Sequence, residues 1–250
     1  MTAALATRGL NKSFGSLVVA SDIAFSLPRG ERYALIGPNG AGKTTLINLL
    51  TGMLKPDAGQ ILLDGDEVSA QSPAARVRRG LVRTFQINSL FPKITALDAV
   101  TLAVCERRGE AGVWWRGLSR YGEAVEEAHT ILTSLRLDHV ERTITKELAY
   151  GQQRLLEIAL ALATRPKVLL LDEPAAGVPK DESGDLFAAI DGLSRDLSIL
   201  FIEHDMNLVF RFASRIIVMV SGRILVEGTP AEIASDPRVR EVYLGKARHG

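Results

Sequence analysis

Short apolar runs alternate with helical patterns along the chain and predict a mixed α/β fold. Continuous apolar runs occur at 33–36, 168–171 and 199–202, and their length and polar flanks are typical of strands buried in a parallel sheet. Apolar residues at 46–50 and 186–193 repeat instead at helical spacing. A strand, a helix and a second strand in succession imply a parallel crossover, so we expect helices packed on a parallel sheet.

Alternating apolar and β-branched residues near the N-terminus predict an antiparallel sheet. Two strands are expected at 5–10 and 17–27, with a polar turn at 11–16 between them. The remaining strands are expected at 60–63, 81–85, 216–220 and 224–227, the last two as a hairpin.

Between 96 and 163 the periodicity is mostly helical, which interrupts the α/β pattern. We therefore expect a single domain in which a helical subdomain is inserted into a sheet core. The expected boundaries are 91–163 for the helical subdomain, and 1–90 with 164–250 for the core. A loop at 109–122 contains Trp114 and Trp115, which either pack between helices or contact a partner.

Composition narrows the classes of function. The chain has 250 residues, of which 46% are hydrophobic and 24% charged, and its net charge is +1, so nothing in its charge favours nucleic acid as a partner. The single cysteine, Cys105, lies in an apolar stretch and is expected to be buried, and the lack of a second cysteine fits a reducing cytosol. No apolar run approaches the length needed to cross a bilayer of roughly 30 Å, and the first residues do not resemble an export signal.

A glycine-rich segment between the 33–36 strand and the 46–50 helix carries the first chemical signal. Its G-x-x-x-x-G-K-T spacing lets backbone N–H groups curl round an anion, and the following helix N-terminus adds partial positive charge. Lys43 can reach the outer phosphates, and the Thr44 hydroxyl can ligate Mg²⁺. The segment consists of Gly37, Pro38, Asn39, Gly40, Ala41, Gly42, Lys43, Thr44 and Thr45. We expect it to bind a nucleoside triphosphate.

An aromatic residue, Phe14, lies in the expected turn at 11–16. If its ring is exposed, it can stack on a nucleotide base, because every base presents a π-face. An ordinary core or edge aromatic is an equally good interpretation of this position.

Polar residues follow the carboxyl ends of three expected strands. Asp172 and Glu173 follow the strand at 168–171, His204 follows the strand at 199–202, and Gln86 ends the strand at 81–85. In open parallel sheets the carboxyl ends of the strands share the ligand crevice. Taken alone, a histidine here would more often be structural and a glutamine a surface residue.

Together these segments resemble the nucleotide-binding subunit of an ATP-binding cassette (ABC) transporter over nearly the whole chain. The matching segments are the phosphate loop at 37–45, Gln86, the signature at 148–152, the second nucleotide motif at 168–173 and His204. The signature distinguishes this family from other proteins with a phosphate loop, because kinases, GTPases and helicases lack the signature. The resemblance implies a P-loop NTPase parallel-sheet core with an N-terminal antiparallel β subdomain and an inserted α-helical subdomain.

The resemblance also implies a role for each site residue and implies ATP and Mg²⁺ as cofactors. Asp172, Thr44 and Gln86 hold Mg²⁺ directly or through water. Glu173 orients or deprotonates the attacking water, and His204 hydrogen-bonds the γ-phosphate that Lys43 also reaches. The signature caps the ATP of a second subunit through Leu148, Ala149, Tyr150, Gly151 and Gln152.

The implied partners are other chains of a transporter. A second ABC ATPase subunit completes a homo- or heterodimer, and two transmembrane permease subunits and an extracytoplasmic solute-binding protein complete the assembly. The chain is then peripheral, at the cytoplasmic face of the inner membrane. Apolar residues that either dock a permease helix or belong to the core are Leu90, Phe91, Pro92 and Ile94.

Three segments are similar to the ATPases of branched-chain amino acid importers, namely 82–86, 148–154 and 201–206. The implied function is ATP hydrolysis that powers import of branched-chain amino acids or related small polar solutes. An exporter-type ABC ATPase for lipid or polysaccharide and a soluble, non-transport ABC ATPase are the alternatives.

Two positions depart from the family pattern. Ala149 replaces the usual signature serine, so a hydroxyl contact to the γ-phosphate is missing. Pro179 stands where the family usually has aspartate or asparagine, and proline lacks both a polar side chain and an N–H group. Unequal ATP sites in a heterodimer are therefore one hypothesis.

Overall fold

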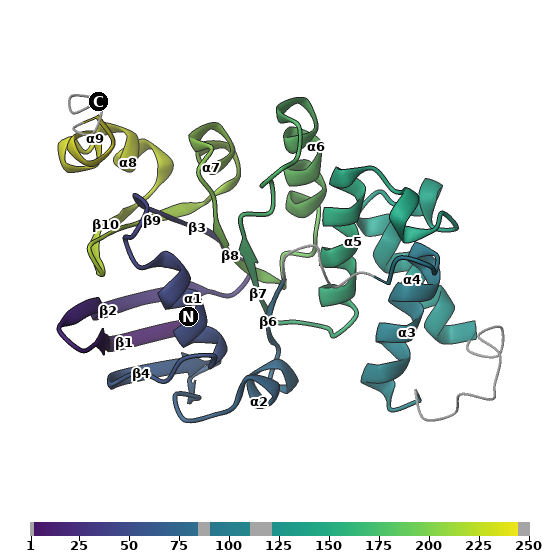
Figure 1. Cartoon of the computed structure of the whole chain (residues 1–250), viewed down its shortest axis with the longest axis horizontal. Coiled ribbons are helices and arrows are strands. Elements are labelled where there is room, and N and C mark those ends of the chain that lie inside the picture. The colour runs from purple at the N-terminus through teal and green to yellow at the C-terminus, as the bar shows by residue number, and fades with distance from the viewer. Residues whose placement is uncertain (1–2, 85–90, 111–121, 245–250) are drawn as a thin grey trace. The chain divides into compact units, whose positions relative to one another are not determined.

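The computed structural model describes residues 3–84, 91–110 and 122–244, which form two compact units (Figure 1). The sheet unit comprises Met1–Arg83, Lys167–Glu173 and Arg195–Gly250, and the helical unit comprises Thr84–Pro166 and Pro174–Ser194. The segment 174–194 differs from the expected division, which places it in the core. It belongs to the helical unit because α6 (Lys180–Asp191) packs against α5 (Tyr150–Leu162).

A six-stranded sheet lies in the sheet unit, in the order β10-β9-β3-β8-β7-β6. Its strands are β3 (Arg32–Ile36), β6 (Leu81–Arg83), β7 (Val168–Asp172), β8 (Ser198–Ile202), β9 (Arg215–Val220) and β10 (Arg223–Gly228). The strands from β9 to β6 are parallel, and β10 forms the expected hairpin with β9. β3 and β8 are buried along their whole length, as their continuous apolar runs predict. β6 ends at Arg83, before the expected end of this strand at 85.

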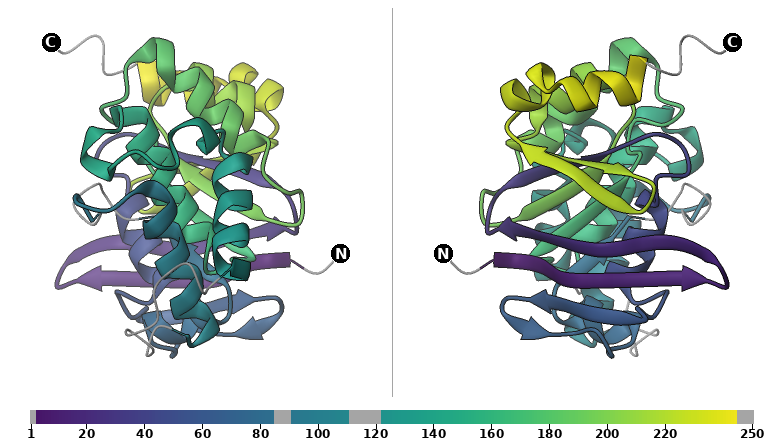
Figure 2. Two further views of the ribbon diagram at one scale, coloured as in Figure 1. Left: turned by 90° about the vertical axis from the view of Figure 1, so that its right-hand side faces the viewer. Right: turned by 90° about the vertical axis from the view of Figure 1, so that its left-hand side faces the viewer.

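An antiparallel sheet in the order β2-β1-β4-β5 completes the sheet unit (Figure 2). Its strands are β1 (Ala3–Phe14), β2 (Leu17–Pro28), β4 (Ala58–Leu63) and β5 (Asp66–Glu67). The expected turn at 11–16 is wrong, because β1 continues to Phe14 and leaves only 15–16 for the turn. Register shifts along β1 accommodate its polar residues, and Asp57 accepts hydrogen bonds from the Lys12 ammonium and the Ser13 N–H group.

Helices of the sheet unit pack around these strands. They are α1 (Lys43–Thr51), α2 (Pro73–Arg78), α7 (Met206–Phe212), α8 (Pro230–Ser235) and α9 (Pro237–Leu244). One apolar core joins α1 to both sheets, with Leu46 and Leu50 of the helix fully buried beside Leu5, Ile23 and Leu35 of the strands. The core therefore fixes the start of α1 at the carboxyl end of β3.

The helical unit contains α3 (Ala96–Arg108), α4 (Gly122–Ser134), α5 and α6, with 3₁₀ turns at Asp138–Val140 and Thr145–Glu147. Cys105 of α3 is buried, as expected. The expected tryptophan pair, Trp114 and Trp115, lies outside the described residues. Among the residues that are described, no helix combines the length and apolar character needed to cross a membrane.

Candidate nucleotide site

The glycine-rich loop connects β3 directly to α1, as expected. The β9–β10 hairpin packs against this loop. A Cβ atom at Gly37 would lie 2.2 Å from the Met219 carbonyl oxygen, and one at Gly42, whose φ is 101°, would lie 2.6 Å from the Val19 carbonyl oxygen. The Gly222 N–H group of the hairpin turn donates to the Ala41 carbonyl at 2.9 Å. Glycine is required at both positions because the backbone approaches so closely.

The Lys43 side chain lies inside the loop rather than in solvent. Its Nζ atom donates to the carbonyl oxygens of Gly37 at 2.8 Å and Pro38 at 3.1 Å. Burial lowers the pKa of Lys43, and the negative charges of Glu173 and Asp172 oppose part of that effect. An anion bound in the loop would therefore favour the charged ammonium.

Glu173 and His204 come together at the ends of β7 and β8. The distance between His204 Nε2 and Glu173 Oε1 is 2.5 Å, and the Glu173 N–H group donates to the Ile202 carbonyl at 3.1 Å. The φ angle of Glu173 is 51°, in the left-handed region that glutamate rarely adopts. The turn after β7 thus directs this carboxylate to the histidine at the end of the adjacent strand.

Asp172, the last residue of β7, contacts a residue that sequence patterns did not single out. Arg83, at the end of β6, donates from Nη2 to Asp172 Oδ2 at 2.5 Å and from Nη1 to Asn48 Oδ1 of α1 at 2.8 Å. The parallel pairing of Arg83 with Leu170 brings the ends of β6 and β7 together. A local pattern does not report this contact, because three separate segments supply its groups.

The start of α5 is held without the usual side-chain cap. Ala149 occupies the N-cap position and has no hydrogen-bonding side chain, whereas Gln152 Oε1 accepts from the Ala149 N–H group at 3.0 Å. The Tyr150 hydroxyl donates to the Ala176 carbonyl at 3.2 Å, and Arg154 Nη2 donates to the same oxygen at 3.3 Å. These bonds tie the signature to the segment that follows Glu173.

Family models match the chain in two places. A model described as ABC transporter covers residues 20–176, which is more than half of the chain, and a model described as branched-chain amino acid ATP-binding cassette transporter covers residues 223–249. The chain belongs to the ABC transporter family.

Full-length relatives of this ABC cassette agree with that assignment. It is 39% identical over 252 residues to the high-affinity branched-chain amino acid transport ATP-binding protein BraF of Pseudomonas aeruginosa, covering 97% of this chain and 98% of the relative. It is 34% identical over 251 residues to a probable branched-chain amino acid transport ATP-binding protein, LivG, of Methanocaldococcus jannaschii, covering 97% of each chain. A crystal structure of the ADP conformation of an ABC transporter cassette shares 33% identity at a TM-score of 0.86, covering 98% of this chain and all of that one. The P-loop ABC ATPase fold and the ATPase activity expected from the sequence are therefore confirmed.

The remaining expected site residues of the cassette lie in different parts of the chain. Phe14 is 51% exposed at the end of β1, with the Lys12 Nζ atom 5.5 Å from its ring centroid. Gln86 lies outside the described residues. The start of α5 belongs to the helical unit, whereas the phosphate loop, Asp172, Glu173 and His204 belong to the sheet unit.

The donor set of the cassette suits Mg²⁺, which prefers oxygen ligands. Asp172 supplies a carboxylate at the end of β7, and the Thr44 hydroxyl is exposed in the first turn of α1. Few protein donors are needed, because Mg²⁺ in nucleotide sites takes most of its oxygens from phosphates and water.

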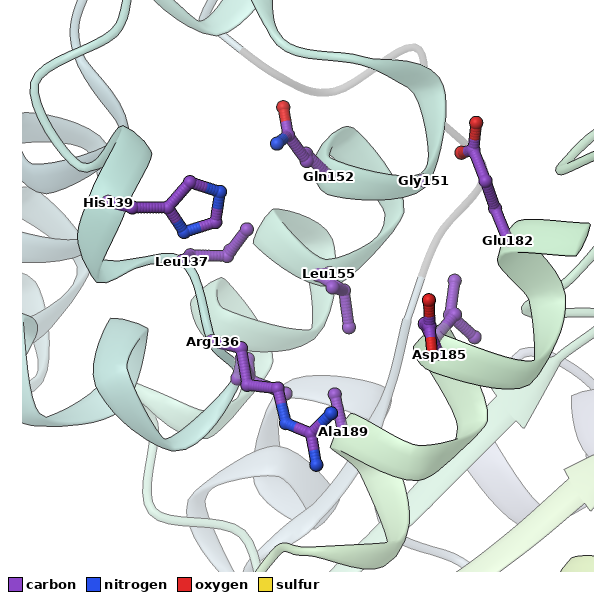
Figure 3. A pocket seen from close by; sticks show the side chains of 11 residues that line it. Arg136, Leu137, His139, Gly151, Gln152, Leu155, Glu182, Asp185 and Ala189 are labelled. Atoms are coloured by element: carbon purple, nitrogen blue, oxygen red, sulfur yellow. The ribbon is translucent and has the colours of Figure 1, made fainter.

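A pocket of about 260 Å³ lies within the helical unit, beside the start of α5 (Figure 3). In this view Glu182 and Asp185 of α6 and Gln152 of α5 line it from neighbouring helices. A Cβ atom at Gly151 would lie 3.1 Å from Glu182 Oε2, so the signature glycine leaves space for that carboxylate. Pro179 is the N-cap of α6, and its carbonyl accepts from the Ser183 hydroxyl at 3.0 Å.

Proposed function

We propose that this ABC ATPase powers the import of branched-chain amino acids or related small polar solutes. The observation that carries the proposal is the match of residues 223–249 to the branched-chain amino acid cassette family. The full-length relatives BraF and LivG carry branched-chain amino acid transport in their names, which favours the importer over the exporter and the non-transport alternatives.

In the proposed mechanism, several residues of the sheet unit each have one role in ATP hydrolysis. Lys43 turns from the Gly37 and Pro38 carbonyls to the outer phosphates, and backbone N–H groups of the loop bind the rest of the triphosphate. Glu173 accepts a proton from the attacking water, and His204, which contacts that carboxylate, is the proposed hydrogen-bond partner of the γ-phosphate. Thr44, Asp172 and Gln86 would hold Mg²⁺, which neutralises charge that develops on the phosphates.

The proposed second subunit completes the site. The N-terminal turn of α5 presents backbone N–H groups at Tyr150 and Gly151 without a hydroxyl cap at Ala149, so an anion is a suitable partner for it. We assign this anion to the ATP held by the other subunit of a homo- or heterodimer. Phe14 is the proposed base-stacking residue, because its ring is exposed.

The proposed membrane partners are two permease subunits at the cytoplasmic face of the inner membrane, served by a solute-binding protein. Phe91 is 61% exposed, which favours docking over core packing for this side chain. Pro92 is also exposed and Ile94 is half-buried, whereas Leu90 lies outside the described residues. A short permease helix could place apolar side chains against Phe91.

Reconstitution of the chain with its permeases and binding protein in proteoliposomes tests the substrate class. We expect leucine, isoleucine or valine bound to the binding protein to stimulate ATP hydrolysis and to be taken up, and Glu173→Gln to abolish both. Stimulation by another solute but by none of these three amino acids would contradict the proposed substrate and leave the ATPase assignment intact.

A further inference from the structure

Arg83 makes two directed contacts for which the proposed mechanism has no use. Its guanidinium lies between the end of β7 and α1, with Nη2 at 2.5 Å from Asp172 Oδ2 and Nη1 at 2.8 Å from Asn48 Oδ1. The Arg83 and Asp172 side chains are only 17% and 19% exposed. Its Nε atom is buried and has no hydrogen-bond partner among the described residues. Partial burial of a guanidinium that is held by two hydrogen bonds costs free energy, so we ask what role its position beside this aspartate has.

The Asp172 carboxylate is therefore already neutralised by a protein cation. Arginine keeps its charge at every physiological pH, and a charge-assisted bond to a carboxylate is among the strongest hydrogen bonds in proteins. Lys43 also interacts electrostatically with Asp172 from the phosphate loop. A divalent ion that approaches this carboxylate meets the repulsion of a permanent positive charge at close range, in a partly buried site where screening is weak.

We propose that Arg83 is a positioning residue that holds Asp172 before the divalent ion arrives, and that the ion and Arg83 compete for this carboxylate. The inference rests on the proposed function only in taking Asp172 as an ion ligand. Arg83 holds the carboxylate in place at the end of β7 through its bond to Asp172 Oδ2. The cost of this arrangement is a weaker affinity for the ion.

Titration of Mn²⁺, followed by its electron paramagnetic resonance signal in the presence of ADP, tests the competition without hydrolysis. We expect Arg83→Met, which keeps the length but removes the charge, to bind Mn²⁺ at least about fivefold more tightly than the wild-type chain. Arg83→Lys keeps the charge and should stay within about twofold of the wild type. Arg79→Met is the matched control, because Arg79 is an exposed arginine of the same unit paired with Asp66, and it should leave Mn²⁺ affinity unchanged.

Unchanged or weaker Mn²⁺ binding by Arg83→Met would overturn the competition, and so would an equal gain in Arg79→Met, which would assign the effect to net charge. If Arg83→Met does not fold, Arg83→Gln replaces it with the same expectation, since glutamine is neutral and can still hydrogen-bond Asn48. Asp172→Asn tests the ion-binding role of Asp172 separately from its competition with Arg83. Retained Mn²⁺ binding in this variant would overturn the ion-binding role of Asp172 itself, whereas lost binding together with no gain in Arg83→Met would overturn the competition alone.

Discussion

Glu173 shows how backbone strain directs a carboxylate. A left-handed φ of 51° costs a glutamate roughly 1 kcal/mol relative to ordinary backbone, and the bond from its N–H group to the Ile202 carbonyl helps to hold it there. The carboxylate consequently lies 2.5 Å from His204 Nε2 instead of following the alternation of β7. A strained acidic residue at the end of a buried strand fits the proposed general base.

Substitution of Glu173 by glutamine tests this role with little change in shape. We expect ATP turnover to fall at least about 100-fold, because general-base catalysis contributes that much, while ATP affinity stays within about twofold. Phosphate release and binding of a fluorescent ATP analogue measure the two quantities. Glu106→Gln, at an exposed position of α3, is the control, and equal losses in both variants would contradict the assignment.

Local sequence patterns predict the candidate site residues that a motif in their own segment marks, and they do not single out Arg83, whose contacts come from other segments. The glycine spacing, Asp172, Glu173 and His204 are visible because each lies at a strand end with a distinctive neighbour. In the sequence, Arg83 looks like any polar residue of a strand. Its proposed role depends on its contacts with Asn48 and Asp172, which lie 35 and 89 residues away. Such contacts follow from strand pairing, which a single sequence does not report.

At the scale of elements, one carboxylate connects three helices of the helical unit. Glu127 of α4 accepts hydrogen bonds from Arg107 at 2.7 Å and Arg108 at 2.9 Å at the end of α3, and from Arg165 at 3.0 Å just after α5. Burial alone would raise the pKa of Glu127, but the three arginines outweigh it and lower the pKa to about 2. The ionised carboxylate therefore stabilises the folded unit.

Acid should remove this stabilisation in a defined interval. Because the folded pKa of Glu127 is lowered, its contribution is complete above the unfolded pKa of 4.5 and is lost as the pH falls towards 2. We expect Glu127→Gln to lower the free energy of unfolding by between about 1 and 3 kcal/mol at pH 7, and the difference from wild type to shrink below pH 4. Urea titrations across this range measure it. Glu123→Gln removes a solvent-exposed carboxylate that pairs with Arg108 and should have little effect at any pH.

The start of α5 depends on a second cross-segment contact. Gly177, with φ of 79°, lies so close to Tyr150 that a Cβ atom there would be 2.8 Å from the tyrosine hydroxyl oxygen. The Tyr150 hydroxyl, hydrogen-bonded to the Ala176 carbonyl, thus positions the loop after Glu173 against the signature.

Removal of that hydroxyl should affect turnover more than nucleotide binding. We expect Tyr150→Phe to lower the kcat of the assembled transporter about threefold to tenfold, since one hydrogen bond is worth about 1 kcal/mol, with no change in the ATP affinity of the isolated chain. Gly177→Ala should lower kcat further. Gly184→Ala in α6 is its control, because nothing lies within 4 Å of a Cβ atom there. A matching loss in Gly184→Ala would contradict the proposal.

Helices and strands could be predicted where several consecutive residues follow one hydrophobic pattern. Continuous apolar runs identified β3, β7 and β8, and helical spacing identified α1 and α5. The extension of β1 to Phe14 was not predicted, because its polar residues 11–13 look like a turn until Asp57 supplies their partners. The grouping of α6 with the helical unit was likewise decided by packing on α5.

At the scale of the whole molecule, the chain carries the two proposed halves of an ATP site in different units. The phosphate loop lies in the sheet unit and the signature in the helical unit. The proposed sandwich lets each half act on a nucleotide shared with a second subunit.

Hydrolysis by the isolated chain should therefore depend on concentration. We expect the phosphate release rate per subunit to rise with protein concentration until a dimer is fully populated, because the signature must come from another chain. Steady-state assays over a 100-fold range of concentration, roughly spanning the dissociation constant, together with sedimentation velocity, measure this dependence. A constant rate per subunit in a monomeric sample would contradict the shared site.

The β9–β10 hairpin constrains the shape of the phosphate loop, although it lies about 180 residues further along the chain. Met219 blocks any side chain at Gly37, and the Gly222 N–H group bonds to Ala41, so the loop and the hairpin can change only as a matched pair. The second strand of the hairpin also begins the segment 223–249, which matches the family model described as branched-chain amino acid ATP-binding cassette transporter. A chimera that exchanges the chain from β9 onward between distant cassettes would therefore bring in another protein's contacts to the phosphate loop, and only exchanges in which the new hairpin fits the loop would preserve ATP binding.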